Sequence, residues 1–130
     1  MKRILITGGT VFVSRFAATW FSERGYDVFV LNRGTRPQVK NVTLLQADRH
    51  CLGDCLKSLS FDAVLDITAY TAQDIRDLLD ALGEFHDYIL ISSGAVYPET
   101  LPRPFRETQP VGENRLWGKY GTDKIAAENL

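Results

Sequence analysis

Tyr120 and Lys124 stand four residues apart, and on a helix this spacing places a phenol and an ammonium group on one face, within reach of one another. A phenol with an ordinary pKa near ~10 is a poor base at neutral pH, but a neighbouring cation favours its ionised form. We therefore expect Tyr120 to exchange a proton with a substrate. The alternative is a chance pair on the surface of a helix, without chemistry.

Ser93 is the third residue that could act on a substrate oxygen. It lies in Ser92-Ser93-Gly94, directly after an apolar run that is typical of a buried strand. Ligands bind at the carboxyl ends of strands in open α/β sheets, where a serine hydroxyl can hydrogen-bond a carbonyl or alcohol oxygen. Together with Tyr120 and Lys124, Ser93 favours chemistry over a chance pair on a helix surface.

A glycine-containing turn near the start of the chain could hold phosphate. An apolar run leads into Thr7-Gly8-Gly9-Thr10 and then into a helical pattern, the place where a dinucleotide pyrophosphate sits on a helix N-terminus. Glycine lets the backbone approach phosphate with no Cβ in the way. Val11 and Ser14 stand where a GxxGxxG fingerprint would have its later glycines. Ser14 is small enough for close packing, whereas we expect Val11 to crowd the phosphate. An ordinary strand-to-helix turn is the alternative.

The end of the next apolar run bears on which dinucleotide would bind. A carboxylate there would accept hydrogen bonds from the ribose 2′-hydroxyl of NAD, but the run ends in Leu31-Asn32-Arg33-Gly34, with Arg36 close behind. A guanidinium can pair bidentately with a phosphate. The sequence therefore favours NADP over NAD. A solvated arginine in a surface turn is the alternative.

Short apolar runs alternate with amphipathic stretches, as expected for βαβ units that build a parallel sheet with helices on both faces. The predicted strands are Arg3 to Thr7, Tyr26 to Asn32, Val42 to Gln46, Ala63 to Ile67 and Tyr88 to Ser92. Pro98 to Trp117 carries four of the five prolines and is expected to be a long loop. A helix is expected from Tyr120 to Leu130, ending without a Gly or Asn cap.

Three further segments have helical spacing of apolar residues. The first carries the rows Phe12, Phe16, Trp20 and Val13, Ala17, Phe21, and another buries Ile75, Leu78, Leu79 and Leu82 before Gly83. The third contains Leu52, Cys55, Leu56 and Leu59, so Cys55 is expected to pack in the core. Cys51, Cys55 and His50 are too few ligands at no recognised spacing for a metal site, and a disulfide is not expected in a reducing cytosol.

Length and charge exclude several classes of protein. A chain of 130 residues suits one domain, residues 1–130. Its net charge of −1 and the lack of a basic run argue against nucleic acid as a partner. No apolar stretch is long enough for a signal peptide or a membrane helix, so we expect a cytoplasmic protein with no membrane partner.

Taken together, these residues resemble the extended short-chain dehydrogenase/reductase family of NAD(P)-dependent epimerases, dehydratases and reductases. The family's TGGTGFIG corresponds to TGGTVFVS, its serine signature to ISSGAVYP, and its YxxxK to YGTDK. LNRG and ADR resemble most closely an atypical subgroup of epimerase-like proteins with poorly defined substrates. The resemblance covers the whole chain and implies a Rossmann-like, doubly wound parallel sheet of about five strands in the order 3-2-1-4-5.

The resemblance also implies roles for individual residues. Ser93 matches the catalytic serine or threonine, Tyr120 the acid/base, and Lys124 the lysine that keeps the tyrosine ionisable and holds the nicotinamide ribose. Asp48 matches the residue that meets the adenine, and Thr68-Ala69-Tyr70 the stretch that runs past the cofactor. The cofactor-binding residues expected in this chain are Gly8, Gly9, Thr10, Phe12, Val13, Asn32, Arg33, Asp48, Arg49, Ala69 and Tyr70.

We therefore expect the N-terminal, cofactor-binding and catalytic portion of an epimerase, dehydratase or reductase that acts on a sugar nucleotide or a small carbonyl or alcohol substrate. Family members run to about 300 residues, so the chain alone is expected to show little turnover, and its last strand to expose an apolar edge inclined to self-associate. The rival interpretation is a non-catalytic dinucleotide-binding or interaction module. A methyltransferase with a similar sheet would not explain YxxxK.

Overall fold

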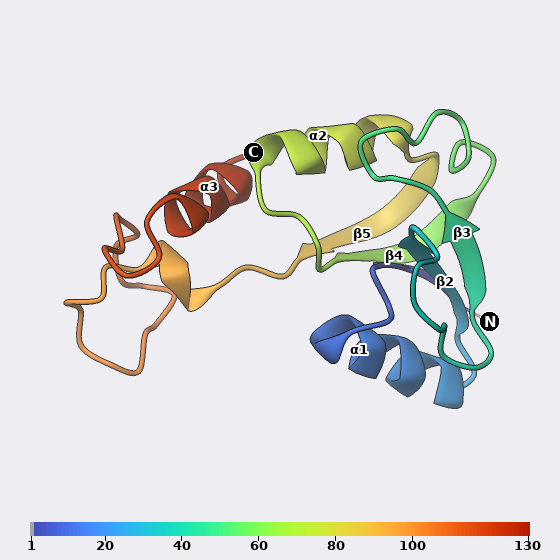
Figure 1. Cartoon of the computed structure of the whole chain (residues 1–130), viewed down its shortest axis with the longest axis horizontal. Coiled ribbons are helices and arrows are strands. Elements are labelled where there is room, and N and C mark those ends of the chain that lie inside the picture. Colours follow the sequence, from blue (N-terminus) through green and yellow to red (C-terminus); the bar gives the residue numbers. More distant parts are fainter. Residues whose placement is uncertain (1) are drawn as a thin grey trace. The chain divides into compact units, whose positions relative to one another are not determined.

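The computed structural model describes residues 2–130. In this part of the chain five parallel strands form one sheet in the order β3-β2-β1-β4-β5, which confirms the predicted fold class and strand order (Figure 1). The strands are β1 (Arg3–Thr7), β2 (Asp27–Asn32), β3 (Thr43–Gln46), β4 (Ser60–Asp66) and β5 (Glu84–Leu90). The helices are α1 (Phe12–Glu23), α2 (Ala72–Ala81) and α3 (Lys119–Glu128), with a 3-10 turn, η1, at Gly94–Val96.

The last two strands begin earlier than the sequence predicts. β4 begins at Ser60 rather than Ala63, and β5 spans Glu84–Leu90 rather than Tyr88 to Ser92. The missed residues of β5 include Glu84, His86 and Asp87, which a strand buried on both faces would not carry. They are tolerated because β5 is an edge strand and its first four residues are exposed.

The chain forms two compact units. The first runs to Thr68 and includes Arg76–Ile91, and the second comprises Ala69–Ile75 and Ser92–Leu130. The sheet and α1 belong to the first unit, and η1 and α3 to the second. The single domain expected over residues 1–130 stays a prediction.

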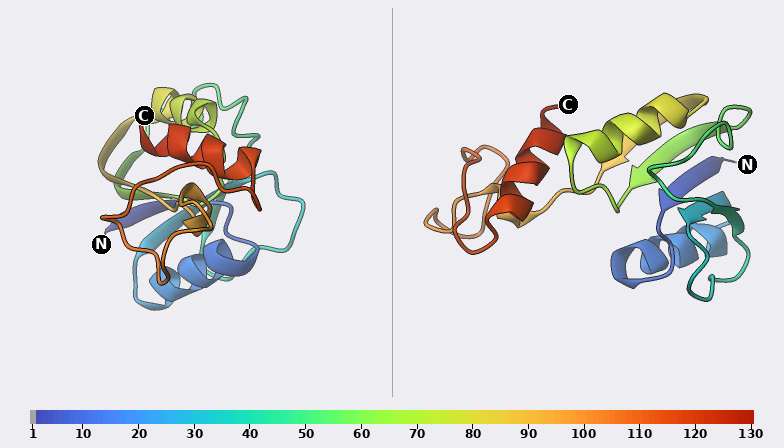
Figure 2. Two further views of the ribbon diagram at one scale, coloured as in Figure 1. Left: turned by 90° about the vertical axis from the view of Figure 1, so that its left-hand side faces the viewer. Right: turned by 45° about the horizontal axis from the view of Figure 1, so that its top comes forward.

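One face of the sheet packs on α1 (Figure 2). Ile4, Ile6, Val28 and Val30 of the sheet and Ala18 of the helix form this buried cluster, with Ala17 and Phe21 packed against it. The apolar row Phe12, Phe16 and Trp20 does not belong to the buried face, and Phe12 and Phe16 are 86% and 70% exposed. The helix approaches the sheet through its small residues, Ser14 and Ala18, which leaves the aromatic row outside.

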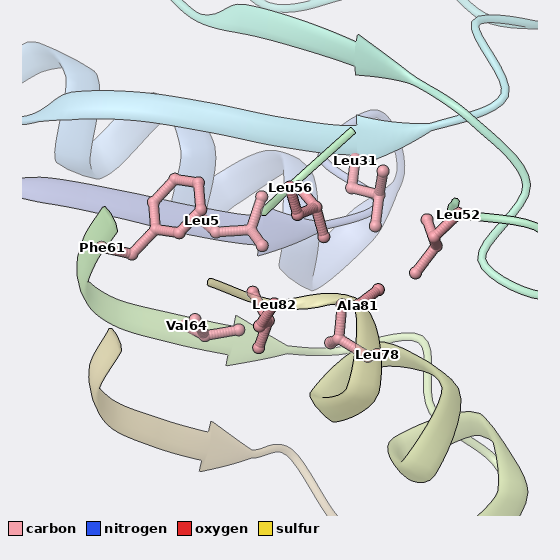
Figure 3. Packing of buried hydrophobic residues seen from close by; sticks show 9 residues of the cluster. All are labelled: Leu5, Leu31, Leu52, Leu56, Phe61, Val64, Leu78, Ala81 and Leu82. Atoms are coloured by element: carbon pink, nitrogen blue, oxygen red, sulfur yellow. The ribbon is translucent and has the colours of Figure 1, made fainter. Parts of the chain in front are cut away.

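The opposite face packs on the second half of α2. Leu5, Leu31 and Val64 from the sheet meet Leu78, Ala81 and Leu82, and Leu52 and Leu56 close the cluster, as the close view shows (Figure 3). Helices therefore lie on both faces of the sheet, as predicted.

The segment between β3 and β4 does not form the helix that its spacing predicts. It is a series of turns in which Leu52 and Leu56 are buried, while Cys51 and Cys55 are exposed. The prediction that Cys55 packs in the core is wrong. Two apolar anchors four residues apart can be buried from consecutive turns as well as from a helix, so the spacing alone does not distinguish the two.

The second unit holds the start of α2 and a long irregular segment between η1 and α3. Thr71 and Asp74 cap α2 reciprocally, because the Thr71 hydroxyl accepts a hydrogen bond from the Asp74 N–H (3.1 Å) and the Asp74 carboxylate accepts one from the Thr71 N–H (3.1 Å). The irregular segment confirms the predicted loop. Its Glu99 pairs with Arg115 (2.8 Å), and hydrogen bonds from Arg115 lower the pKa of Glu99 to about 2.

The last helix, α3, ends at Glu128 with Asn129 at its C-cap. The Asn129 N–H donates to the carbonyl oxygen of Ile125 (3.1 Å), and the Leu130 N–H donates to that of Ala127 (3.3 Å). The expected lack of an Asn cap is therefore wrong.

Candidate functional site

Gly8 and Gly9 lie in the turn between β1 and α1, at positions where a side chain would not fit, and we call these two residues the glycine bed. Their φ angles are +89° and +100°, in the region that favours glycine. A Cβ on Gly9 would lie 2.7 Å from Cγ1 of Val30, and one on Gly8 would lie 3.0 Å from the Ser14 hydroxyl and 3.1 Å from the Thr68 methyl. The turn thus requires glycine at both positions, and no side chain of these two residues covers the backbone just before α1 begins. This geometry fits the pyrophosphate of a dinucleotide.

Residues 11–14 show how the two replaced glycines are accommodated. Ser14 is buried and its hydroxyl donates to the carbonyl oxygen of Val11 (2.8 Å), so close packing of the helix survives the extra oxygen. Val11 has extended backbone (φ −136°), which suits a β-branched residue, and its side chain is half exposed. Phe12 has φ +49° and, like Val13, an exposed side chain. Thr10 is half-buried in the same turn.

Asn32, at the end of β2, holds this turn in place. Its amide N–H groups donate to the carbonyl oxygen of Gly8 (2.8 Å) and to Oε1 of Gln38 (2.9 Å). Its Oδ1 accepts from the Gly34 N–H (2.8 Å) and from Nε2 of Gln38 (3.1 Å). These four bonds use the full capacity of an amide side chain. Asn32 is therefore saturated within the protein, and the neighbouring Arg33 has an exposed side chain.

A buried carboxylate, Asp66, lies at the carboxyl end of β4. Its Oδ1 accepts from the Thr7 hydroxyl (3.0 Å) and from Nη1 of Arg49 (2.9 Å), and its Oδ2 accepts from Nη2 of Arg49 (3.1 Å) and from the Tyr88 hydroxyl (2.5 Å). Nη1 of Arg49 also donates to the Thr68 hydroxyl (2.9 Å). We call Thr7, Arg49, Asp66, Thr68 and Tyr88 the Asp66 node. Its carboxylate is surrounded by donors of the protein and has no surface exposed to solvent.

The Asp66 node changes the acidity of one member. Burial raises the pKa of Tyr88 above that of an ordinary phenol, and the hydrogen bond to Asp66 and its negative charge raise it further. The Tyr88 hydroxyl therefore stays protonated and acts as a donor. Asp48 lies next to Arg49 in the sequence, is exposed, and accepts a hydrogen bond from the His50 N–H (2.8 Å).

In the second unit α3 carries Tyr120 and Lys124. The ring of Tyr120 lies beside the rings of Tyr70 (6.1 Å) and Trp117 (5.9 Å). Lys124 is buried; its ammonium donates to the carbonyl oxygen of Ala69 (2.5 Å) and lies 5.7 Å from the centre of the Tyr70 ring. The structure thus gathers Ala69, Tyr70, Tyr120 and Lys124, four of the residues that the sequence predicts for the site.

Ser93 belongs to the same unit and precedes η1. Its hydroxyl oxygen accepts from the Ala95 N–H (3.1 Å), which leaves the hydroxyl proton available to a ligand. A hollow of about 450 Å³ is lined by Ser93, Asn114, Trp117 and the loop residues Arg103 to Phe105. Gly121 lets α3 approach η1, because a Cβ there would overlap the carbonyl oxygen of Ala95. This contact brings the helix of Tyr120 against the turn that follows Ser93.

Metal clusters and membrane spans are both absent from the described part of the chain. Residues 2–130 contain no group of three or more His, Cys, Asp or Glu side chains arranged to hold a metal ion. None of the helices in that range is long and apolar enough to span a membrane.

No protein-family model matches the chain. Among curated proteins, it is 30% identical over 143 residues to the chloroplast stem-loop binding protein of 41 kDa b of Arabidopsis thaliana, covering 95% of this chain and 38% of that protein. It is 25% identical over 159 residues to the UDP-glucose 4-epimerase of Erwinia amylovora, covering 98% of this chain and 47% of that protein. A solved short-chain dehydrogenase/reductase superfamily protein from Agrobacterium tumefaciens with bound NAD matches with a TM-score of 0.79 and 25% identity, over 98% of this chain and 43% of that one.

Over nearly its whole length the chain is similar to a short-chain dehydrogenase/reductase superfamily protein and to a UDP-glucose 4-epimerase, which confirms the resemblance predicted from the sequence. It spans less than half the length of the relatives just named. Asp66, Tyr88 and Gly121 are the residues around the candidate site that sequence reasoning missed. A carboxylate at the end of an apolar strand, and a glycine inside a helix, were the signals that could have found Asp66 and Gly121.

Proposed function

We propose that this chain is the dinucleotide-binding and catalytic portion of an NAD(P)-dependent epimerase, dehydratase or reductase that acts on a sugar nucleotide or another small carbonyl or alcohol compound. The observation that carries the proposal is the bed of Gly8 and Gly9. Both residues have positive φ, both exclude a Cβ, and both stand where a parallel strand runs into a helix. NAD bound to the Agrobacterium relative supports the same class of cofactor.

The preference for NADP rests on the end of β2. Asn32 has neither a carboxylate to repel a 2′-phosphate nor an unused acceptor for a 2′-hydroxyl, because Gly34 and Gln38 already occupy its oxygen. Arg33 follows directly and exposes its side chain. A guanidinium at this position would pair with the 2′-phosphate of NADP.

The residues of the second unit support acid–base chemistry on a substrate oxygen. When bound, the nicotinamide would supply or accept a hydride. Ser93 would donate its hydroxyl proton to the substrate oxygen in a hydrogen bond, and Tyr120 would take or give the proton at its phenol oxygen. Lys124, buried and held by the carbonyl oxygen of Ala69, would favour the ionised form of the phenol. Tyr70 and Trp117 flank the Tyr120 ring and limit its movement.

Calorimetric titration tests the cofactor. The chain is expected to bind NADPH more tightly than NADH, and Arg33→Ala is expected to remove the difference. Arg76→Ala serves as a matched control, since Arg76 is an exposed arginine on α2. Equal affinities for the two cofactors, unchanged by Arg33→Ala, would contradict the NADP preference.

The second candidate is a non-catalytic binding module. It is supported by the name of the Arabidopsis relative, a stem-loop binding protein, and by Val11 where the fingerprint has glycine. Consumption of NADPH with a panel of sugar nucleotides and small carbonyl compounds separates the candidates. In a protein that joins this chain to the substrate-binding part expected of the family, turnover that Tyr120→Phe abolishes supports the enzyme, whereas tight NADPH binding without turnover supports the module.

Self-association is proposed through the edge strand β5. Phe85 and Ile89 of this strand are exposed, and an uncovered apolar edge can pair with another chain. Light scattering across a concentration series is expected to show dimers or larger species. A location in the cytoplasm stays a prediction of the sequence.

A further inference from the structure

We propose that Arg49 is a positioning residue that fixes the spacing between two parts of the dinucleotide site. These are the glycine bed, where the pyrophosphate would bind, and the turn of residues 48–51, where the adenine would bind. The inference rests on the proposed dinucleotide binding. It assigns to Arg49 an indirect role, in which its guanidinium acts on the site through its hydrogen bonds to Asp66 and Thr68.

Hydrogen bonds to Asp66 hold the guanidinium of Arg49 in place. Both Nη atoms engage the Asp66 carboxylate, with bonds of 2.9 and 3.1 Å, and this fork-to-carboxylate geometry restricts the guanidinium in distance and in angle. Asp66 is wholly buried, and its remaining acceptor positions are taken by Thr7 and Tyr88. A buried carboxylate with four donors has no capacity for another partner, so the pair has one arrangement.

The Asp66 node reaches the glycine bed from two directions. The Thr7 hydroxyl donates to Asp66 and accepts from the N–H groups of Ile67 (2.9 Å) and Thr68 (3.2 Å), so the residue preceding Gly8 is tied to the turn after β4. Arg49 holds the Thr68 hydroxyl, and the Thr68 methyl lies 3.1 Å from the position of a Cβ on Gly8. A displacement of the guanidinium would therefore move the side chain against which the bed rests.

The backbone of Arg49 belongs to the other part of the site. The Asp48 side chain accepts a hydrogen bond from the His50 N–H and its carbonyl accepts one from the Cys51 N–H (2.9 Å), so residues 48–51 form a hydrogen-bonded turn that contains Arg49. His50 also contacts Asp77 (3.3 Å), and the Ala47 N–H bonds the carbonyl of Asn32 (3.0 Å). These other contacts hold the turn on α2 and β2. The hydrogen bonds of the Arg49 side chain join this turn to Asp66 at the end of β4 and to Thr68 beside the glycine bed, whereas the bond of Ala47 to Asn32 joins it to the bed through β2.

Fragments of the cofactor test this role. ADP carries adenine and pyrophosphate together and requires both parts of the site at the correct spacing, whereas adenosine and inorganic pyrophosphate each require one. Arg49→Met removes the donors and keeps an unbranched side chain. We expect this substitution to lower the affinity for ADP by about tenfold or more and the affinities for adenosine and pyrophosphate by much smaller factors. ADP gains affinity because its two linked groups bind together, and this gain is lost when the two parts of the site are no longer correctly spaced.

Three variants control the experiment. Arg49→Lys keeps the positive charge but cannot bind the Asp66 carboxylate through two N–H groups of a planar guanidinium, so it should lower the affinity for ADP by an intermediate factor. Arg76→Met makes the same change at an exposed arginine of α2 outside the node, so the affinity for ADP should change little. Phe61→Leu lies in the core at the opposite end of β4 and lowers thermal stability without touching the node. Binding by Phe61→Leu at wild-type affinity shows that lost stability alone does not weaken ADP.

The outcomes distinguish this inference from the proposed function. Absence of ADP binding by the unaltered chain would overturn dinucleotide binding and the inference with it. Wild-type ADP binding that Arg49→Met and Arg49→Lys leave unchanged would overturn the inference alone. Equal weakening of ADP, adenosine and pyrophosphate by Arg49→Met would also overturn it, because a general loss of structure would then explain the result.

Discussion

Gly9→Ala is expected to destabilise the chain more than the same substitution at another glycine of positive φ. The Cβ that this substitution adds would lie 2.7 Å from Cγ1 and 3.0 Å from Cβ of Val30, a residue with no exposed surface in the core beneath α1. Neither the backbone of β2 nor its packed neighbours can move freely. Gly25 offers a matched comparison, since its φ is +83° and a Cβ there would meet nothing within 4 Å among the described residues.

Comparing Gly9 with Gly25 separates the cost of backbone strain from the cost of steric overlap in the core. A non-glycine residue in the left-handed region costs roughly 1–2 kcal/mol, and this cost applies to Gly25→Ala as well as to Gly9→Ala. Forcing an extra carbon into a packed core costs about 1–3 kcal/mol more, and only Gly9→Ala incurs it. We therefore expect free energies of unfolding lower by roughly 1–2 kcal/mol for Gly25→Ala and roughly 2–5 kcal/mol for Gly9→Ala. The larger loss is a substantial part of the ~5–15 kcal/mol that is usual for a domain.

Urea unfolding followed by circular dichroism measures both values. A double variant, Gly9→Ala with Val30→Ala, removes the two Val30 γ-carbons and should show a favourable coupling of about 1 kcal/mol or more relative to the two single variants. In NADPH titrations of the same proteins, Gly9→Ala should bind NADPH more weakly than the wild type, whereas Gly25→Ala should bind it with wild-type affinity. Equal destabilisation by the two alanine substitutions, with no coupling to Val30, would refute the reasoning.

Three further predictions concern the site and its surroundings. Val11→Gly should tighten NADPH binding in calorimetry by removing a branched side chain beside the glycine bed, at a stability cost of about 0.5–1 kcal/mol; unchanged or weaker binding would show that the turn does not cradle phosphate. Tyr88 has a raised pKa in the folded state, so its contribution to stability is fully present below the ordinary phenol pKa of ~10 and is lost as the pH rises above it. Unfolding titrations should therefore show a steeper alkaline loss of stability for the wild type than for Tyr88→Phe, and parallel curves would contradict the assigned hydrogen bond. Gly121→Ala should lower the thermal midpoint and alter tryptophan fluorescence, because the new methyl group overlaps the Ala95 carbonyl, whereas the exposed Thr122→Ala on the same helix should change neither much.

The order of apolar runs and turn residues was sufficient to predict a parallel sheet with helices on both faces, and the strand order followed from the resemblance to a known family. Continuous apolar runs such as Arg3 to Thr7 are buried on both faces of a parallel sheet, and amphipathic stretches between them must cross over it. Gly8 and Gly9 could also be selected from sequence, because their use depends on local backbone conformation. Ser93, Tyr120 and Lys124 were found by their types and spacing, and their assignment to chemistry stays a proposal.

Tertiary structure decided the features that depend on which surfaces meet. Helical spacing shows that α1 has apolar rows, but the fit of Ser14 and Ala18 against the sheet determined that Phe12 and Phe16 lie outside. Asn32 looked like a ligand of the cofactor in the sequence, yet its four hydrogen bonds became visible only when Gly8 and Gln38 were placed beside it. Side-chain partners distant in sequence are brought together by strand pairing, and for this reason local sequence does not determine their bonds.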